Sequence, residues 1–274
     1  MININFHNKE TDFWKCKRIS DDLKFDHNIA LQQAFDQNVL LEQNKNLLLK
    51  FIYFLKDKKN INSQLYQDIF AEFIVNNSYE KSFLEFGATD GKHLSNSFTL
   101  EENFGWKGVL AEPDPQWHNN LKLNRPNSKI IYECIWKKSD EKMNFFSSEI
   151  GAFSTLDDFR YSDKDTLPGN TSARNKKGKN FEVKTISINK VIEDEFKGVS
   201  PSYISVDTEG SEFEILNSFD FSKYRPIVFT VEHNFTKLQS KIDQLMIKNK
   251  YVRVFEKLTA FDAWYISAEI QDIF

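Results

Sequence analysis

The sequence contains little glycine and little proline. Nine of its 274 residues are glycine and six are proline, against usual frequencies of about 7% and 5%. The first glycine is Gly87 and the first proline is Pro113, so the first 86 residues lack both of the common helix breakers. This absence excludes a turn-rich beginning. It predicts helices over residues 29–57 and 63–76, the second with Ser63 as its N-cap.

Cysteine is also scarce, and the chain has no net positive charge. The two cysteines, Cys16 and Cys134, are too few for a disulfide framework or a thiolate metal site. Acidic residues outnumber basic ones, 40 to 36, and the net charge is −4. Such a chain lacks the overall positive field that holds a nucleic-acid backbone, so we expect no nucleic-acid partner.

Long apolar runs are absent as well. No run reaches the ~18–20 residues that span a bilayer. The first residues lack the basic start and apolar stretch of a secretory signal. We therefore expect no membrane span and a cytoplasmic location.

Large apolar side chains are abundant. Hydrophobic residues make up 40% of the chain, with 26 phenylalanines, which supplies a sizeable core. From residue 82, strand-length apolar runs alternate with helical patterns, which predicts an α/β fold with a mainly parallel sheet. Residues 251–267 break this alternation and predict two adjacent strands with a tight connection. Residues 160–180 have no apolar period and predict a long surface loop.

The first apolar run ends in an acidic glycine turn, LEFGATDG, at residues 84–91. Gly87 and Gly91 let the backbone approach a ligand closely, and Glu85 and Asp90 add two carboxylates. A dinucleotide-binding G-x-G-x-x-G turn instead receives a pyrophosphate, which an acidic turn repels. The turn therefore favours a cationic ligand such as an ammonium or sulfonium group.

The second run ends in Ala111-Glu112-Pro113, about 25 residues after Gly87. This spacing is close to the ~20-residue offset at which a carboxylate receives the ribose hydroxyls of a nucleoside cofactor. A solvated carboxylate at a strand end is the alternative. The order strand, glycine turn, helix, strand and terminal glutamate favours the ribose interpretation.

Several motifs occur in an order that resembles the FkbM family of S-adenosylmethionine-dependent methyltransferases. Residues 83–127 (FLEFGATDGKHLSNSFTLEENFGWKGVLAEPDPQWHNNLKLNRPN) are similar to the opening of the family domain. SYISVDTEGSEFEIL at 202–216 is similar to its Asp-x-Glu-Gly-x-Glu element, and FTVEHN at 229–234 to a later strand end. The segment SQLYQD at 63–68 resembles an element that precedes the domain in part of the family. The resemblance covers roughly residues 63–267.

The resemblance implies a class I methyltransferase, or Rossmann-like, fold with S-adenosylmethionine as cofactor. Its sheet is seven-stranded and mainly parallel with an antiparallel C-terminal strand. We expect an α-helical extension over residues 1–78 and the cofactor-binding domain over 79–274. The residues implied to bind the cofactor are Glu85, Gly87, Ala88, Asp90, Gly91, Asn96, Glu112, Pro113, Cys134 and Ile135. The glycine turn would surround the methionine end, Glu112 the ribose, and Pro113 with the 133–136 segment the adenine.

Methyl transfer requires alignment of the reactants, and a hydroxyl acceptor also requires a base. The candidate catalytic residues are Asp207, Glu209 and His233, with Glu232 beside them, because they follow neighbouring strands. His233 is either the general base or a histidine that orients a carboxylate or packs at the pocket rim. Asp207, Glu209 and His233 could also ligate a divalent cation. A metal-free carboxylate cluster is equally consistent, so no metal is predicted.

The one dense basic cluster, Arg174, Lys176, Lys177 and Lys179, lies in the predicted loop. It either grips an anionic acceptor or is a solvated charge run. We predict O-methylation of a hydroxyl on a sugar, a glycan or a small-molecule metabolite. The alternative is a non-catalytic interaction module that retains the fold. The N-terminal helices are a candidate homodimer interface.

Overall fold

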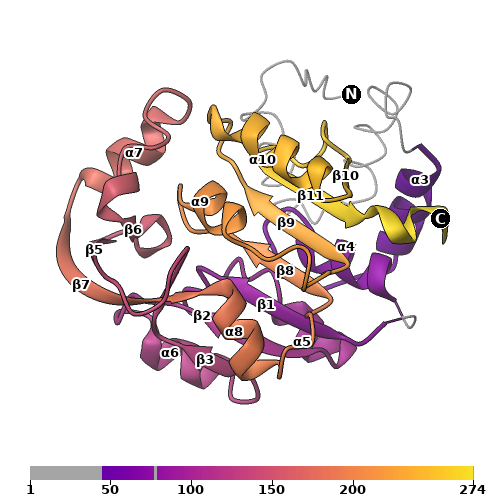
Figure 1. The fold of residues 1–274 in the computed structure, drawn as a ribbon, viewed down its shortest axis with the longest axis horizontal. Coiled ribbons are helices and arrows are strands. Elements are labelled where there is room, and N and C mark those ends of the chain that lie inside the picture. The colour runs from indigo at the N-terminus through magenta and orange to yellow at the C-terminus, as the bar shows by residue number, and fades with distance from the viewer. Residues whose placement is uncertain (1–44, 77–78, 274) are drawn as a thin grey trace.

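A computed structural model of the chain describes residues 45–76 and 79–273. Its centre is a seven-stranded sheet in the order β10-β11-β9-β8-β1-β2-β3 (Figure 1). The strands are β1 Ser82–Phe86, β2 Lys107–Ala111, β3 Lys129–Ile131, β8 Tyr203–Val206, β9 Val228–Glu232, β10 Tyr251–Val254 and β11 Asp262–Ser267. β11 is antiparallel to both of its neighbours, and the other pairs are parallel. The predicted sheet, with its antiparallel C-terminal strand, is confirmed.

Helices cover both faces of this sheet. The helices of the described residues are α3 Lys45–Leu55, α4 Gln67–Val75, α5 Phe98–Phe104, α6 His118–Asn124, α7 Pro168–Asn175, α8 Ile188–Glu195, α9 Glu212–Asn217 and α10 Leu238–Lys248, with 3-10 turns η2 Gly151–Phe153, η3 Asp157–Phe159 and η4 Ala268–Ile273. Phe83 packs in one apolar cluster with α3 to α6, and the next residue, Leu84, packs in another with α8 to α10. Since both faces are buried, the central strands appear in the sequence as continuous apolar runs.

A second sheet stands beside the carboxyl ends of the central strands, in the order β4-β7-β5-β6. Its strands are β4 Cys134–Trp136, β5 Lys142–Ser148, β6 Thr155–Leu156 and β7 Gly178–Ser187. With α7 it forms the left side of the molecule in Figure 1. The apolar run KIIYECIW at residues 129–136 is therefore divided between two strands: β3 joins the central sheet and β4 joins the second one.

The predicted surface loop at residues 160–180 is wrong, because these residues include α7 and the start of β7. Pro168 opens α7 in its first turn, where a missing N–H costs nothing. The 251–267 strands are adjacent as predicted, but seven residues, 255–261, connect them instead of a tight turn.

The N-terminal part of the prediction holds in part. α3 falls within the predicted 29–57 helix, whose first residues lie outside the described ones. The 63–76 helix begins later, at Gln67, because Tyr66 has a left-handed φ of 70°. Ser63 is not its N-cap: the Ser63 hydroxyl donates to Asp68. No helix in residues 45–76 and 79–273 has the length and apolar character needed to cross a membrane.

Candidate functional site

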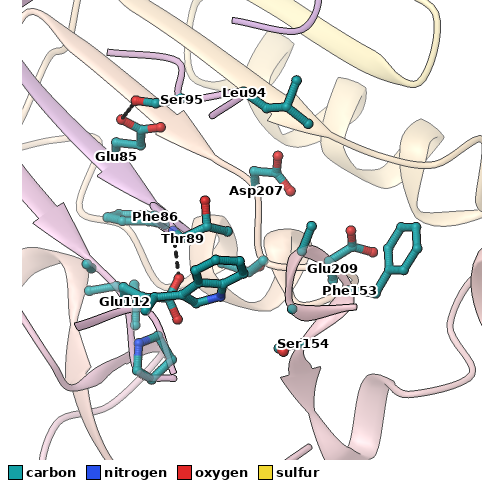
Figure 2. Close-up of a pocket in the computed structure, with 18 of the residues that line it drawn as sticks. Glu85, Phe86, Thr89, Leu94, Ser95, Glu112, Phe153, Ser154, Asp207 and Glu209 are labelled. Atoms are coloured by element: carbon teal, nitrogen blue, oxygen red, sulfur yellow. Dashed lines mark hydrogen bonds between the residues drawn. The ribbon is translucent and has the colours of Figure 1, made fainter. Parts of the chain in front are cut away.

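The carboxyl ends of three neighbouring strands, β1, β2 and β8, line one cavity, and β9 ends beside them. Phe86 pairs with Ala111, so Gly87 and Glu112 leave β1 and β2 at the same level. Val206 pairs with Val231, which sets Asp207 beside Glu232. The cavity has a volume of about 250 Å³ and lies between these ends and the second sheet (Figure 2). Ligands of parallel α/β sheets bind at this edge.

Gly87 sits where no side chain fits. Its φ is +69°, and an added Cβ would lie 2.0 Å from the backbone oxygen of Asp207. Its N–H donates to Ala111 O at 3.1 Å. Gly91 also has a left-handed φ, +74°, and an added Cβ there would meet Leu121 and Arg125. Both predicted glycines thus shape the turn, and Gly87 borders the cavity directly.

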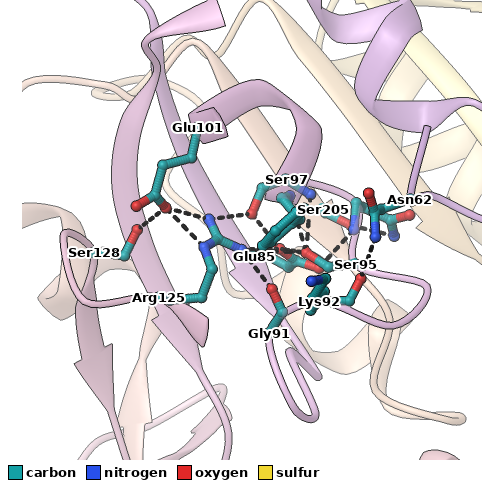
Figure 3. Close-up of polar contacts among 12 residues, drawn as sticks. Asn62, Glu85, Gly91, Lys92, Ser95, Ser97, Glu101, Arg125, Ser128 and Ser205 are labelled. Atoms are coloured by element: carbon teal, nitrogen blue, oxygen red, sulfur yellow. Dashed lines mark hydrogen bonds and ion pairs between the residues drawn. The ribbon is translucent and has the colours of Figure 1, made fainter. Parts of the chain in front are cut away.

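Glu85 holds the segment after the turn instead of offering a free carboxylate. It accepts hydrogen bonds from the Ser95 hydroxyl at 3.0 Å, the Asn96 N–H at 2.8 Å and the Ser97 hydroxyl (Figure 3). Burial raises the pKa of Glu85, and the Arg125 charge opposes this rise. Glu85 lines the cavity, but its carboxylate is occupied by these donors and therefore fixes the conformation of residues 95–97.

Arg125 is a structural residue of the site. It lies in the 83–127 stretch that resembles the family, but the sequence predicted no role for it. It is 1% exposed and forms an ion pair with Glu101 at 2.7 Å. It also donates to Gly91 O at 3.1 Å and to the Ser97 hydroxyl at 3.0 Å (Figure 3). A buried arginine with these partners ties the glycine turn to α5 and α6.

Asn96 presents an open acceptor to the cavity. Its amide group donates to the Ser205 hydroxyl at 2.9 Å, while its Oδ1 is buried without a partner. Asn96 lines the cavity together with Asp90. Asp90 Oδ1 accepts from the N–H groups of Lys92 and His93, which stabilises the turn. Ala88 is buried in the turn and does not line the cavity.

Glu112 is the carboxylate on the β2 side of the cavity. One oxygen accepts from Thr89 N–H at 2.8 Å (Figure 2). The other accepts from Asp114 N–H, also at 2.8 Å. Burial raises its pKa from 4.5 to about 8. Pro113 follows and also lines the cavity. The two backbone bonds fix both oxygens in place.

The wall next to Glu112 is apolar. Cys134 and Ile135 of β4 line it, with Phe145 and Leu156 from the second sheet. Burial raises the pKa of Cys134 to about 12, so its thiol remains neutral and acts as a small apolar group. Such a wall suits a flat aromatic base.

Acidic side chains gather on the other side of the cavity. Asp207 and Glu209 line it (Figure 2), and Glu232 ends the adjacent strand β9. One oxygen from each of the three lies within 4.8 Å of the others. Burial raises the pKa of Asp207 and of Glu232 well above the usual range, and the neighbouring carboxylates raise them further. Burial raises the pKa of Glu209 to about 7, with the Arg174 charge opposing it.

Arg174 belongs to this acidic group and not to an exposed basic cluster. It is fully buried, bonded to Asp163 at 2.8 Å and to Glu209 at 2.6 Å. Lys177 pairs with Glu149 at an exposed position. A solvated charge run over residues 174–179 is therefore wrong for Arg174, because this residue lies on the buried side of α7.

His233 does not line the cavity. Its Nδ1 accepts from Phe235 N–H at 3.0 Å, and its Nε2 lies 3.0 Å from Asp262 O. An Nδ1 acceptor leaves the proton on Nε2, where it is donated to that carbonyl. Both nitrogens are thus engaged at the point where β9 ends beside the start of β11, and the histidine holds the backbone there in place.

Three further segments, none of which the sequence singled out as binding residues, complete the cavity. Gln64 precedes α4, His93 and Leu94 follow the glycine turn, and Phe153 and Ser154 come from η2 and its end. These residues lie in irregular backbone, so no strand-end or spacing signal marks them.

Solved structures with a similar arrangement include several methyltransferases. Precorrin-6y C5,15-methyltransferase from Geobacter metallireducens GS-15 is 10% identical, with a TM-score of 0.40 over 76% of this chain and 89% of that one. The N-terminal domain of human METTL16, solved with SAH, is 11% identical, with a TM-score of 0.41 and 98% of each chain covered. A putative O-methyltransferase from Klebsiella pneumoniae is 8% identical, with a TM-score of 0.38 over 84% and 90%.

Among curated proteins, none matches the chain significantly. The methyltransferase FkbM domain, in contrast, matches residues 85–254. The match spans more than half of the chain and includes the glycine turn, Glu112 and the acidic segment after β8. Together with the seven-stranded sheet, it establishes that the chain belongs to the FkbM methyltransferase family.

Proposed function

We propose that this S-adenosylmethionine-dependent methyltransferase transfers a methyl group to a hydroxyl oxygen on a sugar, a glycan or a small-molecule metabolite. The observation that carries the proposal is the division of one cavity between Glu112 on one side and Asp207 with Glu209 on the other (Figure 2). One side suits the cofactor and the other a hydroxyl acceptor.

The residues around the glycine turn fit the cofactor. The absence of a side chain at Gly87 opens the cavity next to the backbone of Asp207. The buried Asn96 Oδ1, which has no partner, would accept a hydrogen bond from the ammonium group of the methionine end. Glu112 would accept from both ribose hydroxyls, because a carboxylate binds two donors at once. Cys134 and Ile135 would pack against the adenine ring.

The bound cofactor supplies a methyl group on a positively charged sulfur. An oxygen nucleophile attacks this methyl carbon directly and displaces the sulfur. The chain's own contribution is mainly alignment of the acceptor with that methyl group. Asp207 or Glu209 would take the proton that the hydroxyl loses as the new C–O bond forms and the C–S bond breaks. His233 is left out of this step, because both of its ring nitrogens are engaged elsewhere.

A non-catalytic interaction module is the alternative. The ordered Glu112 and the open Asn96 acceptor favour the enzyme, since a module that only contacts other proteins does not require them. A homodimer through the N-terminal helices, the absence of a nucleic-acid partner and a cytoplasmic location stay predictions.

Thermal shift with S-adenosylmethionine, S-adenosylhomocysteine and NAD tests cofactor binding. At 100 times its dissociation constant, an adenosyl ligand should stabilise the chain by ~2.7 kcal/mol, whereas NAD should not. Glu112→Ala should remove most of this shift. Absence of any shift with both adenosyl ligands would reject the enzyme, and a shift unchanged in Glu112→Ala would reject only the ribose assignment.

The acceptor class needs a separate measurement. Release of S-adenosylhomocysteine should be followed with sugars, oligosaccharides and hydroxylated metabolites, and with amine and thiol analogues as controls. We expect turnover with hydroxyl acceptors, and Asp207→Asn or Glu209→Gln, whichever removes the base, should abolish it at unchanged cofactor affinity. Turnover confined to amines or thiols would contradict O-methylation.

A further inference from the structure

Glu232 is a buried carboxylate with an unsatisfied oxygen. It ends β9 and is 7% exposed, and its Oε2 has no hydrogen-bond partner. An unpaired buried carboxylate costs free energy unless something compensates its charge. Its neighbours on the cavity side are the carboxylates of Asp207 and Glu209, and their charges add to this cost.

The described residues compensate only part of this charge. Arg174 pairs with Glu209, but it also pairs with Asp163, so one guanidinium serves two carboxylates. Arg174 therefore leaves Asp207 and Glu232 uncompensated. Asp207 is half-buried and faces the cavity, so a cation could reach the group from that side.

The geometry points to a divalent cation held by Asp207, Glu209 and Glu232. Their three ligand oxygens lie within 4.8 Å of one another. Opposite oxygens are about 4.8 Å apart around a calcium ion and about 4.2 Å apart around magnesium, twice the usual metal–oxygen distances. All three ligands are hard oxygens, which favours Mg²⁺, Mn²⁺ or Ca²⁺ over softer metals. The cavity leaves the remaining coordination positions to water or to a ligand.

This site is compatible with the proposed methyl transfer but does not depend on it. Each carboxylate has two oxygens, so a carboxylate that binds the cation through one oxygen can still accept the proton of the acceptor hydroxyl on the other. If the proposed function holds, an acceptor hydroxyl bound to the cation would lose its proton more readily. His233, which the sequence suggested as a ligand, is replaced here by Glu232.

Metal binding can be measured without any reaction. The full chain, stripped with a chelator, should be titrated with Mn²⁺ while the electron paramagnetic resonance signal of free Mn²⁺ is followed, and with Mg²⁺ and Ca²⁺ by calorimetry. We expect one bound Mn²⁺ per chain. Glu232→Gln should weaken its affinity at least tenfold, because the substitution removes a ligand that can become an anion, and it should not lower the melting temperature, because Gln has the same size as Glu. Asp207→Asn is the second variant, in case the first does not fold.

Glu112→Gln is the matched control, since it changes a cavity carboxylate outside the group. It should retain Mn²⁺ binding while losing affinity for S-adenosylhomocysteine, and Glu232→Gln should show the reverse. No binding of the three cations at millimolar concentration, or equal Mn²⁺ affinity in wild type and both acidic-group variants, would overturn the metal site. S-adenosylhomocysteine binding without metal binding would overturn the site and leave the proposed function standing.

Discussion

Glu112 shows how burial changes the chemistry of a single carboxyl group. Its pKa lies at about 8, although two N–H groups donate to it. A carboxyl group with a raised pKa retains its proton near neutral pH, and a ligand that needs the ionised form must displace that proton. Hydroxyls of a ribose bind best to the ionised form.

We therefore expect the affinity for S-adenosylhomocysteine to rise between pH 6 and 8 and to level off above about 8. The rise should approach tenfold per pH unit, because one proton is released on binding. Burial lowers the pKa of the neighbouring His118, and the Cys134 thiol is neutral throughout, so neither accounts for such a rise. Burial raises the pKa of Glu209, across the cavity, to about 7, so a variant of Glu112 must separate the two carboxyl groups. Calorimetric titration over this range measures the effect.

Glu112→Gln is the control for this dependence. It should give a nearly flat profile and, at pH 8, an affinity about ten- to a hundredfold lower, since a charged acceptor contributes ~1.5–3 kcal/mol per hydrogen bond. An equally steep profile in this variant would assign the titration to another group.

At the scale of elements, two buried arginines connect segments that are distant in sequence. Arg125 joins the residue after α6 to Glu101 of α5 and to the glycine turn. Arg174 joins α7 to the segment after β8 through Glu209. In both cases a long side chain with several donors satisfies groups from separate elements. These links position the loops that surround the cavity.

Arg125→Ala should lower the free energy of unfolding by ~3–5 kcal/mol, because it leaves the Glu101 carboxylate buried without its partner. It should also weaken S-adenosylhomocysteine binding by loosening the glycine turn. Urea denaturation and calorimetry measure the two effects. Lys129→Ala, which removes the more exposed pair with Glu195, should change stability by less than ~1 kcal/mol. Equal effects of the two substitutions would contradict the role of Arg125.

At the scale of the whole molecule, the described N-terminal helices share the core of the central sheet. Phe51 of α3 and Phe70 of α4 pack against Phe255 and Trp264, with the Phe70 and Trp264 ring centroids 4.5 Å apart. Gln67 of α4 donates to Asp262 of β11 at 2.9 Å. These helices have no separate core, so they should unfold together with the sheet. The boundary between residues 1–78 and 79–274 stays a prediction.

Phe70→Ala should destabilise the whole chain by ~3–5 kcal/mol in a single transition, because it leaves a cavity in this shared core. Tyr53→Ala, at a position that is 79% exposed on α3, should change stability by less than ~0.5 kcal/mol. Circular dichroism and S-adenosylhomocysteine binding should be followed in the same urea titration. Loss of helical signal before loss of ligand binding would show that the helices form a separate unit.

Much of this protein follows from local patterns in its sequence. The order of strands and helices is visible because strands buried on both faces are apolar throughout. The glycine turn and Glu112 are visible because close backbone approach and ribose binding demand particular residues at a set spacing. The family follows from those same residues.

The tertiary structure alone decided which charges are buried together. Arg174 looks exposed in sequence beside three lysines, yet Asp163 and Glu209 meet it from 11 and 35 residues away. His233 looks catalytic at a strand end, but the backbone of Phe235 and Asp262 occupies its ring nitrogens. Glu232 is brought to the acidic group by strand pairing between β8 and β9. Periodicity reports which face of an element is apolar, whereas the partners of a polar group depend on contacts that only folding creates.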